Sequence, residues 1–156
     1  MTTSADLDEF DRKILRALQE SADYSMADLG AHVGLSHTPC WRRLKRLEAD
    51  GFIRGKVTLL DSKMLNLNVT VHASVIVKER DAASCEKFEH SIMAIPEVVE
   101  CYSTTGERDY LLKIIVSSVQ DYEKLLRKTL AELPNLSSIQ SVFALNQIKY
   151  STQLPL

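Results

Sequence analysis

Apolar residues recur at helical spacing through the first thirty-three positions of the chain. Each stripe covers one side of a helix, so the pattern predicts two amphipathic helices. Neither can bury its stripe alone, and a third element must complete a small core. The stripes are Leu7, Phe10, Ile14, Leu15 and Leu18 in the first segment, and Met26, Leu29 and Val33 in the second.

A third helix is predicted to begin at Ser36, directly after a glycine turn at Gly34. Serine is a favoured N-cap, whose hydroxyl accepts a backbone N–H, and Pro39 falls in the first turn, where its missing N–H costs nothing. Two helices joined by a short turn, the second with one free face, are typical of a helix-turn-helix unit. The packed face of the third helix is predicted to be Cys40, Leu44 and Leu47, with Trp41 at its margin.

Gly51 is well placed to end this helix. The segment that follows, FIRGKVTLLD at 52–61, alternates between apolar and polar residues and predicts a strand that would form a wing. Residues 61–68 are then a short, apolar connector.

From Val69 the period of the pattern changes to two, which predicts a half-buried strand over 69–78. A helix over 81–95 follows, then a hairpin whose strands flank residues 106–109, a helix over 122–133 and a last strand over 139–150. The order βαββαβ is that of a ferredoxin-like module. The sequence therefore predicts an α+β protein with a winged helix-turn-helix at 1–60, a connector at 61–68 and a ferredoxin-like domain at 69–156.

Composition places the chain among globular proteins and argues against a membrane role. Of 156 residues, 45% are apolar and 26% charged, and no apolar run approaches the roughly 20 residues that span a bilayer. The N-terminal segment lacks the apolar core of a signal peptide. Three cysteines without CxxC spacing fit a reducing compartment. We therefore expect a cytoplasmic protein.

Charge is distributed unevenly, although the net charge is only −2. Six cations lie between Arg42 and Lys56, against Glu48 and Asp50 as the only acids there. Such a basic stripe is either a solvated helix face or a surface that binds phosphate, because the field of a local patch acts over about 8 Å whatever the total charge. Its agreement with the turn, the N-cap and the predicted wing favours double-stranded DNA.

The exposed side of the third helix carries Thr38, Arg42, Lys45 and Arg46. Arg42 and Arg46 are one turn apart, so both can reach neighbouring base pairs, whereas Lys45 suits a phosphate. Arg43 lies at the boundary, as either a groove reader or a stem that covers the core.

Other chemistry finds little support in the sequence. The four histidines show no metal-ligand spacing with one another or with the cysteines, and no nucleophile has an adjacent base. Cys40 is either a core residue or a reactive thiol, and Trp41 either packs or stacks on the DNA backbone. A small ferredoxin-like enzyme and a DNA-compacting protein without an effector remain alternative functions.

Three segments resemble the Lrp/AsnC family of feast/famine regulators. They are GLSHTPCWRRLKRLEADGFIRG, TGERDYLLKIIV and ALNQIKYSTQLPL, and the likeness extends over nearly the whole chain. Similar family members control amino-acid breakdown; they include activators of cysteine detoxification and regulators of branched-chain keto-acid dehydrogenase. The resemblance implies a transcriptional regulator without a cofactor that binds a small amino acid. It also implies a homodimer formed through the second domain that assembles into an octamer or a related ring.

The resemblance also implies roles for particular residues. A dimer would place two recognition helices about 34–36 Å apart on a pseudo-palindromic operator. The DNA readers would be Ser36, His37, Thr38, Arg42, Arg43 and Arg46, with Lys45 and Lys56 on phosphates.

The effector site implied by the resemblance lies around Gly106, Asp109 and Tyr110, close to where dimers meet. Asp109 either accepts the ligand ammonium or caps the hairpin turn, and Gly106 lets backbone N–H groups approach a carboxylate. Arg108 departs from the family pattern: its guanidinium either binds a ligand carboxylate or pairs with Glu107. An apolar or sulfur-bearing amino acid is the expected effector.

Overall fold

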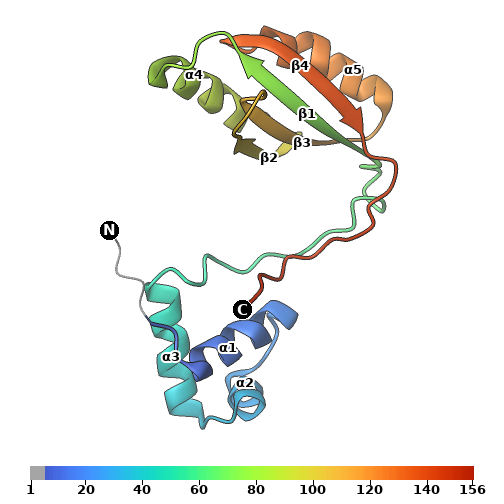
Figure 1. The fold of residues 1–156 in the computed structure, drawn as a ribbon. Coiled ribbons are helices and arrows are strands. Elements are labelled where there is room, and N and C mark those ends of the chain that lie inside the picture. Colours follow the sequence, from blue (N-terminus) through green and yellow to red (C-terminus); the bar gives the residue numbers. More distant parts are fainter. Residues whose placement is uncertain (1–5) are drawn as a thin grey trace. The chain divides into compact units, whose positions relative to one another are not determined.

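The computed structural model describes residues 6–156. The first unit contains three helices, α1 (Glu9–Glu20), α2 (Met26–Val33) and α3 (His37–Ala49), as the apolar stripes predict (Figure 1). None of the helices described is long and apolar enough to cross a membrane. The core of this unit consists of Ile14, Leu15, Ala17, Leu29, Val33, Cys40, Leu44 and Leu47.

The turn between α2 and α3 has the predicted geometry. Gly34 adopts a left-handed conformation with φ of 76°, which favours glycine. Ser36 occupies the N-cap position, with extended backbone, and Cys40 N–H donates to its carbonyl. The predicted side-chain cap is wrong, because the Ser36 hydroxyl accepts no bond from the helix. The hydroxyl is therefore not used to begin α3.

Gly30 sets how closely the turn approaches α2. The Leu35 N–H donates to the Gly30 carbonyl over 2.8 Å. A Cβ atom on Gly30 would lie 2.7 Å from the backbone oxygen of Leu35, closer than real Cβ contacts. The helix-turn-helix crossing thus needs a residue without a side chain at this point.

We expect Gly30→Ala to lower the free energy of unfolding by about 1–3 kcal/mol, because overpacking against backbone outweighs the better helix propensity of alanine. Urea denaturation measures this. Gly55→Ala is the matched control, since nothing lies within 4 Å of its Cβ position. A Gly30→Ala variant as stable as the wild type would show that the backbone at Leu35 can shift to accommodate the added Cβ atom.

The second unit is a four-stranded antiparallel sheet of order β2-β3-β1-β4, with α4 and α5 on one face (Figure 1). This topology confirms the α+β class and the predicted ferredoxin-like module. The core includes Phe88 from α4 and Tyr122 from α5, packed on alternate residues of β1 and β3. The elements are β1 (Val69–Val77), α4 (Ala82–Met93), β2 (Val98–Ser103), β3 (Tyr110–Val116), α5 (Val119–Lys128), the 3-10 helix η1 (Leu130–Glu132) and β4 (Leu136–Phe143).

Two predicted strands differ from the structure. No strand forms over 52–61, so the strand expected for the wing is wrong for this single chain. Val57 is 81% exposed there, and a strand without a partner for its N–H and C=O groups is not stable. β4 ends at Phe143 rather than 150; Ala144 N–H still donates to the Thr70 carbonyl, and the strand pairing with β1 stops there.

The C-terminal tail belongs with the first unit. Contacts group residues up to Leu59 with Lys149–Leu156, and Leu60–Ile148 form the second unit. The Gln19 side chain on α1 exchanges two hydrogen bonds with the backbone of Leu154, and Arg16 Nε donates to the Leu156 carbonyl over 3.0 Å. The sequence pattern predicted that this tail belongs to the second domain, because its contacts with α1 do not show in the spacing of apolar residues. The functional boundaries at 60 and 69 stay a prediction.

Candidate nucleic-acid interface and effector loop

The N-terminal part of α3 presents a free polar surface. Ser36, His37 and Thr38 are exposed, as is Arg42 one turn further along. None of these four side chains has a hydrogen bond or ion pair with any residue in the range 6–156. They lie away from the packed face of Cys40, Leu44 and Leu47, which holds α3 on the core. This surface is chemically free to meet a partner.

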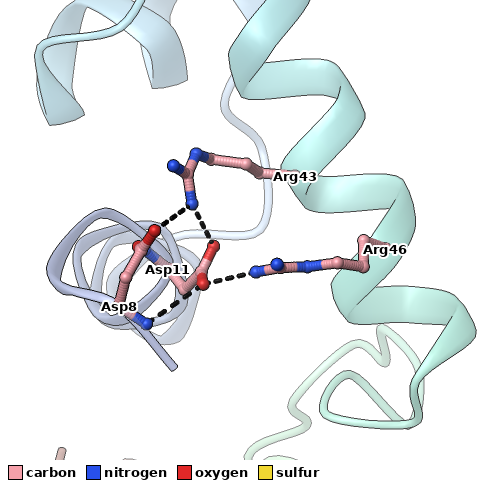
Figure 2. A network of polar contacts seen from close by, with 4 residues as sticks. All are labelled: Asp8, Asp11, Arg43 and Arg46. Carbon is pink, nitrogen blue, oxygen red and sulfur yellow. Dashed lines mark hydrogen bonds and ion pairs between the residues drawn. The ribbon is translucent and has the colours of Figure 1, made fainter. Parts of the chain in front are cut away.

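Two other arginines of α3 are held by α1. Asp11 is fully buried, and its two carboxylate oxygens accept from Arg43 Nη1, over 2.9 Å, and from Arg46 Nη2. Arg43 Nη1 also lies 2.6 Å from Asp8 Oδ2. Figure 2 shows both guanidinium groups pointing from α3 toward the start of α1. We call these four residues, Asp8, Asp11, Arg43 and Arg46, the Asp11 network.

The same carboxylates begin α1. Asp8 is the N-cap, whose Oδ1 accepts from Asp11 N–H over 2.9 Å, and Asp11 Oδ2 accepts from Asp8 N–H over 3.2 Å. The Asp11 N–H and then the Arg43 guanidinium lower the pKa of the Asp8 carboxyl. The Asp8 and then the Asp11 carboxylate raise the pKa of Arg43, which also lies 5.6 Å from the centre of the Phe10 ring. The Asp11 network thus stabilises the N-terminus of α1 and also holds α1 against α3.

The Asp11 network gives the predicted DNA residues different degrees of freedom. Arg43 has an exposed side-chain fraction of 26%, and its Nη1 contacts both aspartates. Of the two alternatives predicted for Arg43, this arrangement matches a side chain that covers the core. Arg46 is 49% exposed and uses one nitrogen on Asp11, so its other guanidinium N–H groups have no partner among the described residues. Arg42 alone of the three has no partner among the described residues.

The two predicted phosphate contacts make only weak internal bonds. Lys45 pairs with Glu48 over 2.7 Å at the surface, where ion pairs contribute about 0–1 kcal/mol and exchange readily. Lys56 Nζ lies 3.5 Å from the Ala22 carbonyl and is exposed. Both ammonium groups can therefore move to a phosphate at small cost.

In the second unit, the turn between β2 and β3 contains the predicted effector loop. Gly106 has φ of 107°, a conformation that favours glycine. Arg108 Nη2 donates to Gln140 Oε1 on β4 over 2.7 Å, so its partner within residues 6–156 is Gln140 rather than Glu107. The loop is closed by Thr104, whose hydroxyl donates to the Arg108 carbonyl.

Asp109 is bonded on both oxygens. Oδ2 accepts from Val77 N–H and Oδ1 lies 2.9 Å from Arg80 Nε, both at the end of β1. This is a capping role, although it joins the loop to β1 rather than closing the turn itself. A ligand ammonium at Asp109 would have to displace Arg80, which is 67% exposed.

Tyr110 faces the core rather than the loop. Its ring is 4% exposed and lies 4.8 Å from the Phe88 ring, and its hydroxyl donates to Glu89 Oε1. Burial, and then the bond to Glu89, raise the pKa of the phenol. The structure therefore brings Gly106, Arg108 and Asp109 together and turns the side chain of Tyr110 toward α4.

Sequence reasoning missed Asp11, Arg80 and Gln140. Asp11 carried a signal, because it lies one turn after Leu7 and one before Leu15 on a stripe that is otherwise apolar, and a buried acid needs a cation. Arg80 and Gln140 had none: their contacts with the loop arise from strand pairing between segments far apart in sequence.

Comparison with known proteins identifies the two units. Residues 7–54 match the model of a winged helix-turn-helix DNA-binding domain, and residues 70–154 match that of the Lrp/AsnC ligand binding domain. The chain belongs to the Lrp/AsnC family. It is a transcriptional regulator with a DNA-binding and a ligand-binding domain, not an enzyme.

Similar proteins extend over the whole chain. The glutamate uptake regulatory protein of Zymomonas mobilis is 40% identical over 96% of this chain and 91% of its own. The DNA-binding transcriptional activator DecR of Escherichia coli is 37% identical over 96% and 99%. A transcriptional regulator of Neisseria meningitidis, solved in complex with L-Met, is 35% identical with a TM-score of 0.92 over 96% and 97%.

For this Lrp/AsnC protein we expect Asp11→Asn to lower the free energy of unfolding by about 1.5–3 kcal/mol, because the hydrogen bonds from Arg43 and Arg46 lose their anionic acceptor. Chemical denaturation measures the change. Asp23→Asn, at an exposed position, is the control and leaves stability unchanged. Equal stability of Asp11→Asn and the wild type would show that the Asp11 network does not stabilise the fold.

Proposed function

We propose that the N-terminal end of α3 reads the major groove of a pseudo-palindromic operator, with Ser36, His37, Thr38 and Arg42 as the base-contacting residues. The absence of intramolecular partners for these four side chains within the described range carries the proposal. Lys45 and Lys56 contact phosphates, as does the outward part of Arg46. Arg43 positions the helix from the side of α1.

The proposed regulator acts as a homodimer built on the second unit. Helices α4 and α5 cover one face of the sheet, and the other face carries apolar side chains next to the Glu100–Lys113 ion pair. An open apolar sheet face is stabilised by burial against a second copy, and two-fold symmetry then matches a palindromic operator. Assembly of dimers into an octamer or a related ring follows from the family resemblance. The apolar residues of this face include Ile76, Tyr102, Leu111, Ile115 and Val142.

We further propose that a small amino acid binds at the loop at 106–109 and thereby controls the regulator. The regulator acts in the cytoplasm, and its targets are genes of amino-acid metabolism. The named relatives regulate glutamate uptake in one case and bind L-Met in another. The Arg108 guanidinium, whose one partner among the described residues is the neutral Gln140, can exchange that bond for a ligand carboxylate. We propose an apolar or sulfur-bearing amino acid as the effector, in agreement with these observations.

Arg42→Ala tests the DNA interface. We expect affinity for a selected operator to fall about 5- to 150-fold, the range of one lost bidentate base contact, while affinity for random DNA changes little. Quantitative footprinting with both DNAs at fixed salt measures the ratio. Arg12→Ala, an exposed position on α1, is the control. Equal losses on both DNAs would make Arg42 a phosphate contact.

Differential scanning fluorimetry against the twenty amino acids tests the effector loop. A ligand that binds only the folded state raises the Tm, and we expect at least one apolar or sulfur-bearing amino acid to do so. Arg108→Ala should reduce that shift, since a charge-assisted bond to the ligand in the loop is lost. Arg127→Ala, whose guanidinium pairs with Glu123 at the surface of α5, is the control. An unchanged shift in Arg108→Ala would contradict the carboxylate assignment.

A further inference from the structure

A cavity in the second unit lies apart from the effector loop. It is open to solvent on one side, its volume is about 490 Å³, and its walls come from α5, the end of β3, Glu97 and Leu67. β3 begins at Tyr110 beside the loop and ends at Val116 in the cavity wall. At about 3.3 Å per residue, the two places are about 20 Å apart along the strand. One small ligand cannot occupy both.

The cavity combines an apolar wall with charges of both signs. Leu67, Val116 and Leu125 supply the apolar part, and Val116 is almost fully buried. The charged residues at its edge are Glu97, Asp121, Lys124 and Lys128.

Two of these four charges are already satisfied. Asp121 accepts from the hydroxyls of Ser117 and Ser118 and pairs with Lys124 over 3.2 Å. The hydroxyls, and then Lys124, lower the pKa of the Asp121 carboxyl to about 2. Asp121 is thus an ionised residue in the first turn of α5, after the N-cap Ser118, with its partners in place.

The other two charges have no side-chain partner in the described part of the chain. Neither the Glu97 carboxylate nor the Lys128 ammonium makes a hydrogen bond or ion pair there, although both line the cavity. Glu97 is half-buried. A free carboxylate and a free ammonium beside an apolar wall are the complement of an α-amino acid, whose ammonium, carboxylate and side chain each need a partner when water is removed.

We infer that this cavity is a second amino-acid site, in which Glu97 binds the ammonium, Lys128 the carboxylate, and Leu67, Val116 and Leu125 an apolar side chain. Leu67 stands two residues before β1, in the segment that leads from the DNA-binding unit. Occupation of the site therefore contacts the connecting chain directly. The inference goes beyond the proposed loop site and does not depend on it.

Titration calorimetry of the full chain with L-leucine and with L-methionine tests the site. In the wild type we expect at least one of the two probes to bind, and Glu97→Gln and Lys128→Gln each to weaken that binding at least tenfold at this site. Lys87→Gln, at an exposed position of α4, is the matched control for loss of a lysine charge. Melting curves without ligand confirm that the variants remain folded.

The loop variant Arg108→Gln separates the two sites. We expect it to retain the binding that Glu97→Gln and Lys128→Gln lose. If those two variants bind both probes as the wild type does, if Arg108→Gln alone abolishes all binding, or if the wild type binds neither probe, the cavity is not an amino-acid site. Operator binding in a gel shift is measured in parallel, so failure of the cavity site is distinguishable from failure of the DNA-binding proposal.

Discussion

The DNA-binding unit depends on the ion pairs that the buried carboxylate of Asp11 makes with α3. An ionised group without solvent needs cations and hydrogen-bond donors around it, and here Arg43 and Arg46 supply them from α3. Apolar packing of Leu44 and Leu47 permits some rotation of α3 about its axis, whereas two directed ion pairs to one carboxylate do not. The orientation of the exposed face of α3 follows from this constraint.

The Asp11 network also divides the cations of α3 by role. Four basic residues follow one another closely between Arg42 and Arg46, and charge alone would give all of them to DNA. The structure holds two of them against α1 and places Lys45 in a surface pair, whereas Arg42 has no partner in the described part of the chain. The proposed base recognition therefore lies at the N-terminal end of the helix, where Ser36, His37 and Thr38 also have no side-chain partner among residues 6–156.

Periodicity predicted the existence of each α-helix and strand described in the two modules, because each buries one face against a core and the apolar spacing records that face. It missed a break: the helix expected over 122–133 is α5, which ends at Lys128, followed by the separate 3-10 helix η1. It failed where an element needs a partner to exist: residues 52–61 alternate like a strand but find no ladder in one chain. It also failed for contacts between distant segments, since neither the Arg108–Gln140 bond nor the Asp109–Arg80 pair leaves a local pattern. The contacts of Asp11 were also missed, although this acid on an otherwise apolar stripe carried a signal in the sequence.

A double-mutant cycle on the free energy of unfolding, with Asp11→Asn, Arg46→Gln and the double variant, tests the role of this carboxylate most directly. Residues in one ionic network show coupling energies of about 0.5–3 kcal/mol, and we predict at least about 1 kcal/mol for this pair. The same cycle with Arg42→Gln in place of Arg46→Gln should give none. Additivity of Asp11→Asn and Arg46→Gln within about 0.3 kcal/mol would contradict the account.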